Sequence, residues 1–134
     1  MSERLTFDSE PLLAFFVGER GGEIVKDRLS KIQRGEAEGF INVINLSEVN
    51  CILYRMNPLL AEEKCQILSQ IRMTVLPIEN NDLWRNAARI KAGHSLSLAD
   101  AFAIATAEKQ KSTLVISRDK EYNELNIKLL KVRD

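Results

Sequence analysis

The sequence predicts an α/β fold in which helices cover both faces of a mostly parallel sheet. Segments rich in β-branched and apolar residues alternate with segments whose apolar residues recur at helical spacing, as expected of strand–helix–strand crossovers. Two of the expected strands, residues 39–44 and 113–116, are largely apolar, which is typical of strands buried on both faces. With 134 residues, 45% of them hydrophobic and 28% charged, the chain is expected to form one globular domain over residues 1–134.

The first third of the chain is expected to contain one strand and two helices. Residues 5–7 form a short strand, and Pro11 favours a helix over residues 12–17 because proline is preferred in the first helical turn. Apolar residues then recur at i, i+4 and i+7 over residues 25–32. This spacing predicts an amphipathic helix, which Gly35 ends.

The middle of the chain is expected to place two helices between two strands. Residues 39–44 form a β-branched run bounded by glycine, which predicts the second strand. Helix-forming residues 46–55 are interrupted before Pro58, and a further helix is expected over residues 60–71. The run at residues 74–78 predicts the third strand.

The last third is expected to contain two helices followed by two strands. Helical spacing predicts a helix over residues 83–93, which ends at its glycine. The alanine-rich segment at residues 97–110 predicts the next helix, because alanine loses no side-chain entropy on folding. Residues 113–116 form the fourth strand and residues 127–130 a short fifth one.

Composition excludes several classes of protein. Nineteen basic and nineteen acidic residues give a net charge of +0, which argues against a protein that coats DNA through many phosphate contacts. The longest apolar run, residues 12–17, is too short to span a bilayer, and the N-terminus shows no signal-peptide pattern, so no membrane association and a cytoplasmic location are expected. Cys51, Cys65 and His94 are too few for a four-ligand zinc site of the usual Cys/His kind. Both cysteines are expected to be small buried residues, and His94 a polar residue between two helices.

Four acidic residues fall at or near the ends of the expected strands. Asp8 ends the first strand, Glu48 opens the helix after the second, and Asp119 follows the fourth, while Asp100 lies in the first turn of the alanine-rich helix. Ligands gather at the carboxyl ends of parallel strands. Each acid also has a purely structural interpretation, since Glu48 and Asp100 suit the first turn of a helix and Asp119 suits a turn. Sequence spacing leaves both interpretations open.

Four motifs, in this order, resemble those of the PIN domain family. They lie at residues 7–9, 46–49, 95–105 and 114–122, and each contains one of the four acids. In the fourth motif, Ser117 stands where the family commonly has threonine and keeps the hydroxyl group. The resemblance covers residues 5–122 and implies a PIN-like three-layer α/β/α fold with a central, mostly parallel sheet of four to five short strands.

Among PIN domains, the small size resembles the VapC toxins of toxin–antitoxin pairs. The resemblance implies an endoribonuclease that depends on Mg²⁺ or Mn²⁺, cleaves RNA with a metal-activated water, forms a homodimer and is covered at its active site by a small antitoxin. Asp8 and Asp100 are expected to be the central metal ligands, Asp119 to complete the pocket, and Glu48 to bind a second ion, hold metal-bound waters or orient the nucleophile. An all-carboxylate set suits these hard cations. Ser117 either supports Asp119, contacts a substrate phosphate or only caps a turn.

Two other functions are compatible with parts of the sequence. A PIN-like domain could bind RNA or protein without catalysis, although such a module has no need to hold four like charges together. A receiver-type phosphoacceptor domain would need paired acids early in the chain, where Asp8 stands alone apart from Glu10. Arg85 and Arg89 are i, i+4 neighbours on one helix face, and they either contact the RNA backbone or form a solvated surface.

Overall fold

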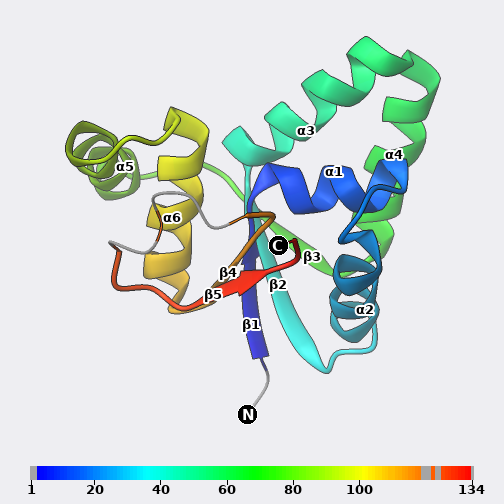
Figure 1. The fold of residues 1–134 in the computed structure, drawn as a ribbon, viewed down its shortest axis with the longest axis horizontal. Helices are drawn as coiled ribbons and strands as arrows, with labels where there is room; N and C mark the ends of the chain where they lie inside the picture. Colours follow the sequence, from blue (N-terminus) through cyan, green and yellow to red (C-terminus); the bar gives the residue numbers. More distant parts are fainter. Residues whose placement is uncertain (1–2, 119–121, 123–124, 134) are drawn as a thin grey trace.

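The computed structural model describes residues 3–118, 122 and 125–133, and within them five strands form one parallel sheet in the order β3-β2-β1-β4-β5 (Figure 1). The strands are β1 (Glu3–Phe7), β2 (Ala37–Asn42), β3 (Met73–Leu76), β4 (Thr113–Ile116) and β5 (Leu129–Lys131). The helices are α1 (Ser9–Val17), α2 (Gly22–Gln33), α3 (Val43–Met56), α4 (Pro58–Gln70), α5 (Asn81–Gly93) and α6 (Leu98–Gln110). The predicted α/β class is confirmed, and the four strand pairs described are all parallel.

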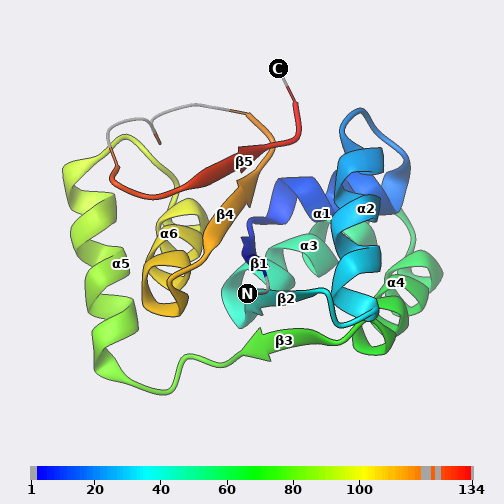
Figure 2. The same cartoon turned by 90° about the horizontal axis from the view of Figure 1, so that it is seen from below.

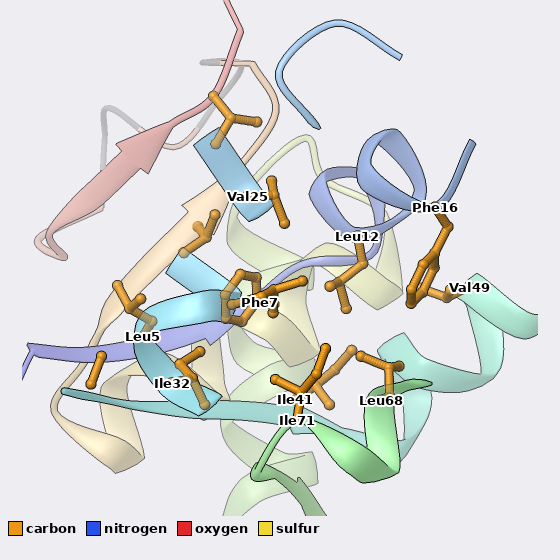
Figure 3. Packing of buried hydrophobic residues seen from close by; sticks show 14 of the residues in the cluster. Leu5, Phe7, Leu12, Phe16, Val25, Ile32, Ile41, Val49, Leu68 and Ile71 are labelled. Atoms are coloured by element: carbon orange, nitrogen blue, oxygen red, sulfur yellow. The ribbon is translucent and has the colours of Figure 1, made fainter. Parts of the chain in front are cut away.

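The sheet lies between two layers of helices, with α1 to α4 on one side and α5 and α6 on the other (Figures 1 and 2). Strand residues alternate between the two layers because successive side chains point to opposite faces. Phe7, Ile41 and Val115 pack in the core on the α1–α4 side, part of which Figure 3 shows. Leu114 and Ile116 pack in the second core, with α5 and α6. Both faces of the central strands are therefore buried, as their apolar sequence predicts.

Helix α6 is the most deeply buried helix of the α5–α6 layer. Residues 101–107 are all buried, so the helix has almost no solvent-facing side over this stretch. Four of these seven residues are alanine, and their small side chains let the helix lie close to the sheet and to α5. The alanine-rich composition thus reflects packing on all sides in addition to helix propensity.

The boundary between β2 and α3 differs from the prediction. The strand ends at Asn42 and the helix begins at Val43, three residues before the predicted start at residue 46. Asn42 has extended backbone angles, and its Oδ1 accepts a hydrogen bond from the Asn45 N–H at 2.9 Å, so it is the N-cap of α3. The strand-like residues Val43 and Ile44 therefore belong to the first helical turn.

Smaller corrections concern other boundaries and the cysteines. Helix α1 begins at Ser9 rather than residue 12, strand β3 ends before Pro77, and β5 lies one to two residues after its predicted place. The prediction of two buried cysteines is wrong for Cys51, which is exposed, because it lies on the outer face of α3. Cys65 is half-buried and lies 2.8 Å from Asn50. Among the described residues no helix has the length and hydropathy of a bilayer-spanning segment.

Candidate active site at the carboxyl edge of the sheet

Asp8 is a buried acid at the point where β1 ends. Its backbone N–H continues the strand pairing by donating to the Val115 carbonyl at 3.1 Å, and only 5% of the residue is exposed. Its Oδ1 accepts the Ser9 N–H at 2.7 Å, and its Oδ2 accepts the Tyr122 hydroxyl at 3.0 Å. The strand thus fixes the backbone of Asp8, and the Ser9 N–H and the Tyr122 hydroxyl, with a longer contact from Asn45 Nδ2 at 3.5 Å, fix its carboxyl group.

Asp100 reaches the same edge from the other layer of helices. The side chain of Ser97 caps α6 by accepting the Asp100 N–H at 3.0 Å, so Asp100 lies in the first helical turn, as predicted. Asp100 is only partly buried. A helix that begins at this point brings its first-turn carboxylate toward the end of β1.

The Asp100 carboxylate affects the titration of the buried Asp8 carboxyl group. The pKa of Asp8 lies well above its ordinary value, first because burial disfavours the charged form and second because the Asp100 carboxylate repels it. A hydrogen bond with the Asp100 side chain raises this pKa further, whereas the Ser9 N–H and the Tyr122 hydroxyl lower it. Burial, together with the two acids, also raises the pKa of Tyr122, so its phenol stays protonated and remains a donor.

Glu48 completes a cavity around these two acids. The cavity has a volume of about 250 Å³ and is lined by Asp8, Ser9, Glu10, Leu13, Glu48, Ile52, Ser97 and Asp100. A larger cavity of about 820 Å³ lies at the amino ends of β1 and β4, and it is not lined by Asp8, Glu48 or Asp100. Three of the four predicted acids, Asp8, Glu48 and Asp100, therefore meet in the smaller cavity.

Of the two remaining predicted residues, Ser117 directly follows β4. Asp119 falls outside the described residues. Ser117 is 2% exposed, and its Oγ has no hydrogen-bond partner among the residues that the structure describes. Its carbonyl accepts the Arg133 N–H at 2.8 Å.

The donor set in the cavity fits a hard divalent cation. In the described part of the chain, no three His, Cys, Asp or Glu side chains are arranged so that they could already hold a metal ion. Asp8 and Asp100 nevertheless form a close pair, Glu48 lines the same cavity, and all three offer oxygen only, which suits Mg²⁺ or Mn²⁺ better than zinc. The repulsion that raises the Asp8 pKa is also what a cation between the two carboxylates would relieve.

Sequence reasoning missed two buried asparagines beside the acids. Asn42 donates from Nδ2 to the Phe102 carbonyl at 3.1 Å and to Thr106 Oγ1 at 2.8 Å, which joins the start of α3 to α6. Asn45 donates from Nδ2 to the Ala99 carbonyl at 3.0 Å. The signal was available: both asparagines interrupt an otherwise apolar run at residues 40–46.

The two arginines of α5 and the histidine lie apart from the acids. Arg85 and Arg89 are exposed, and neither lines the cavity of Asp8 and Asp100. The guanidinium of Arg85 lies 5.3 Å from the ring centre of Trp84. His94 is half-buried, and its Nδ1 is 3.1 Å from the Ile90 carbonyl at the end of α5, in keeping with its predicted place between two helices.

A comparison with protein-family models identifies the family of the chain. The family model described as PIN domain matches residues 5–128. No relative was found among curated protein sequences. Several solved structures share the fold at low sequence identity.

Three of these structures illustrate the likeness. A toxin–antitoxin complex from Klebsiella pneumoniae has a chain that is 18% identical, with a TM-score of 0.73 over 96% of this chain and 97% of that one. VapBC2 from Rickettsia felis, bound to a DNA fragment from its promoter, is 16% identical, with a TM-score of 0.72 over 96% and 98%. VapC20 of Mycobacterium tuberculosis, described as a toxin that cleaves the sarcin–ricin loop, is 17% identical, with a TM-score of 0.72 over 92% and 95%.

Proposed function

Because the chain belongs to the PIN domain family, we propose that it is a metal-dependent endoribonuclease and the toxin of a VapBC-type toxin–antitoxin pair. One observation carries the proposal. The buried Asp8 carboxyl lies against the Asp100 carboxyl, and Glu48 lines the same small cavity at the carboxyl edge of the sheet. A nuclease that works through divalent cations needs such a set of oxygen ligands.

The four acids take the following roles. Asp8 and Asp100 hold Mg²⁺ or Mn²⁺, Asp119 completes the pocket, and Glu48 binds a second ion, holds its waters or orients the nucleophile. A divalent cation held by these residues would supply the activation of water and the neutralisation of charge on the phosphodiester. The chain keeps Asp8 in place through the Ser9 N–H and the Tyr122 hydroxyl.

The descriptions of the similar structures support the substrate and the partner that we propose for this chain. One of them is described as an RNA-cleaving toxin and another as a toxin–antitoxin complex, which supports an RNA substrate and an antitoxin for this chain. We include in the proposal that the antitoxin covers the cavity of the acids and that the toxin is a cytoplasmic homodimer of single-domain chains.

A function limited to binding RNA or protein does not account for the acids. Burial and the nearby Asp100 carboxylate disfavour the charged form of Asp8 and raise its pKa, so an ionised Asp8 destabilises the metal-free protein. A surface that only binds RNA or protein does not need two acids held this close together. A divalent-cation site does need them. Catalysis therefore explains the observed geometry better than binding alone.

The test is RNA cleavage by the purified chain in Mg²⁺, in Mn²⁺ and in EDTA. Cleavage is expected with either cation, to stop in EDTA and to fall at least a hundredfold in Asp8→Asn, because the ligand set holds no cationic substitute for the metal. The matched control is Asp27→Asn, which removes an exposed carboxylate from α2 and is expected to cleave like the wild type. Undiminished cleavage in EDTA would contradict the mechanism, and RNA binding without cleavage in any cation would favour the binding module.

A further inference from the structure

Asn45 is the polar side chain that connects the two acidic elements of the cavity. It lies in the first turn of α3 and is fully buried. Its Nδ2 donates to the carbonyl of Ala99, the residue before Asp100, at 3.0 Å, and lies 3.5 Å from Oδ1 of Asp8. One carboxamide thus reaches from the end of β1 to the first turn of α6.

The backbone of Asn45 is held as firmly as its side chain. Its N–H donates to the capping side chain of Asn42 at 2.9 Å. Its carbonyl accepts the buried hydroxyl of Ser9 at 3.2 Å. Hydrogen bonds from β2 and from α1 therefore fix the residue from which the carboxamide extends.

The other end of the carboxamide is not satisfied. Oδ1 of Asn45 is buried and has no hydrogen-bond donor among the described residues. A buried acceptor without a donor destabilises a fold, and an apolar side chain of the same size would avoid this cost. The packing of α3 alone therefore does not explain an asparagine at this position.

We propose that Asn45 is a positioning residue of the cation site, one that sets the placement of Asp8 relative to Asp100. The inference rests on the proposed function. The two carboxylates repel each other and would move apart in the absence of a cation. By holding the Ala99 carbonyl and bordering Oδ1 of Asp8, the carboxamide keeps the first turn of α6 against the end of β1, so that the ligands are in place before the cation binds. Groups that orient metal ligands in this way change metal affinity by about 10- to 100-fold.

The test measures Mn²⁺ affinity by calorimetry, together with RNA cleavage, in Asn45→Leu and Asn45→Ala. Leucine keeps the branched shape of the side chain, leaves no cavity and removes the hydrogen bonds, so this variant is expected to fold even if the alanine variant does not. In Asn45→Leu the Kd for Mn²⁺ is expected to rise at least tenfold, and the rate of cleavage at low Mn²⁺ to fall in proportion.

Two controls on the same helix separate positioning from general destabilisation. Asn50→Ala removes a half-buried amide that contacts Cys65, and Leu53→Val weakens the buried core without touching the acids. Both are expected to keep the Kd for Mn²⁺ within twofold of the wild type. An equal loss of affinity in Leu53→Val and Asn45→Leu would overturn the proposal.

The behaviour of the wild type shows whether the role of Asn45 or the whole proposed function has failed. If the wild type binds Mn²⁺ and cleaves RNA while Asn45→Leu has an unchanged Kd, only the role of Asn45 is wrong. If the wild type neither binds Mn²⁺ nor cleaves RNA, the proposed function fails and the inference fails with it.

Discussion

The hydroxyl of Tyr122 donates to Oδ2 of Asp8 at 3.0 Å, although 114 residues separate them in the sequence. Both residues are buried, with 2% and 5% of their surface exposed. The hydrogen bond compensates part of the cost of burying the Asp8 carboxylate, which its other neighbour, Asp100, increases. Tyr122 therefore contributes to the site through Asp8.

Replacing Tyr122 with phenylalanine tests this compensation. The ring keeps its volume, and one donor to a buried carboxylate is lost, so at a pH above the raised pKa of Asp8 the free energy of unfolding is expected to fall by about 1.5–3 kcal/mol. Urea denaturation measures the change. The matched control is Tyr54→Phe, because the hydroxyl of Tyr54 donates to Glu62 on the exposed surface, where the loss is expected to stay below about 1 kcal/mol. Equal effects of the two substitutions would contradict a special role for Tyr122.

A second prediction concerns the pH dependence of the metal-free protein. The pKa of Asp8 is raised above 3.8 in the folded state, so between 3.8 and the raised value the native state binds a proton that the unfolded state does not. The contribution of Asp8 to stability therefore increases as the pH falls through the raised pKa, and its full penalty is present above that pKa. Because Asn carries no charge, Asp8→Asn in EDTA is expected to be more stable than the wild type at high pH, with a difference that shrinks as the pH falls. Urea denaturation across pH measures this difference, and a pH-independent difference would exclude ionisation of Asp8 as its cause.

The arrangement of strands and acids was readable from the sequence because it depends on local patterns. Apolar runs and glycines mark the strands, and parallel strands bring their carboxyl ends to one edge, so Asp8 and Glu48 could be expected there. The place of Asp100 depended on where its helix begins, which the Ser97 cap decides. The position of β1 at the centre of the sheet follows from long-range pairing, which no local pattern contains.

The roles of Asn42 and Asn45 were not predicted, because they too depend on contacts that no local sequence pattern contains. Val43 and Ile44 are β-branched, so local propensity extends β2 through them. The capping hydrogen bond of Asn42 overrides that propensity and starts α3 earlier. This shift places Asn45 in the first turn of α3, where its carboxamide reaches Asp8 and the Ala99 carbonyl. Asp119 lies outside the described residues, and its role remains a prediction.

A third prediction compares two sets of basic residues. Arg85 and Arg89 lie apart from the acidic cavity, whereas the exposed Arg118 lines a neighbouring cavity that shares Glu10 and Leu13 with it. Arg118→Ala is therefore expected to weaken RNA binding and reduce the slope of log affinity against log salt by about one.

The double variant Arg85→Ala with Arg89→Ala serves as the comparison. It is expected to leave the salt slope unchanged, because the two guanidinium groups form a solvated surface. Binding is measured with an uncleaved RNA in EDTA over a salt series. A reduced slope in the double variant, with no change in Arg118→Ala, would place the RNA over α5 instead.

The last prediction separates the cation-binding interpretation of Asp100 from the helix-capping one by the sign of a stability change. In the metal-free protein, Asp100 repels the buried Asp8 carboxylate, so Asp100→Asn keeps the shape of the side chain and removes this repulsion. The stability in EDTA is then expected to hold or rise, while the thermal stabilisation by Mg²⁺ and the rate of RNA cleavage fall sharply. Thermal melts with EDTA and with Mg²⁺ measure both effects.

If Asp100 served only the helix, its loss would have the opposite sign. Removing a favourable charge from the first turn of α6 would lower the stability by about 0.3–1 kcal/mol and leave cleavage intact. Ser97→Ala shows what loss of a cap does, because Ser97 accepts the Asp100 N–H, and this variant is expected to lose about 1 kcal/mol of stability in EDTA. Opposite shifts of Ser97→Ala and Asp100→Asn in EDTA therefore identify repulsion between carboxylates as the dominant effect at Asp100. A less stable but fully active Asp100→Asn protein would instead assign this acid to the helix and remove it from the cation site.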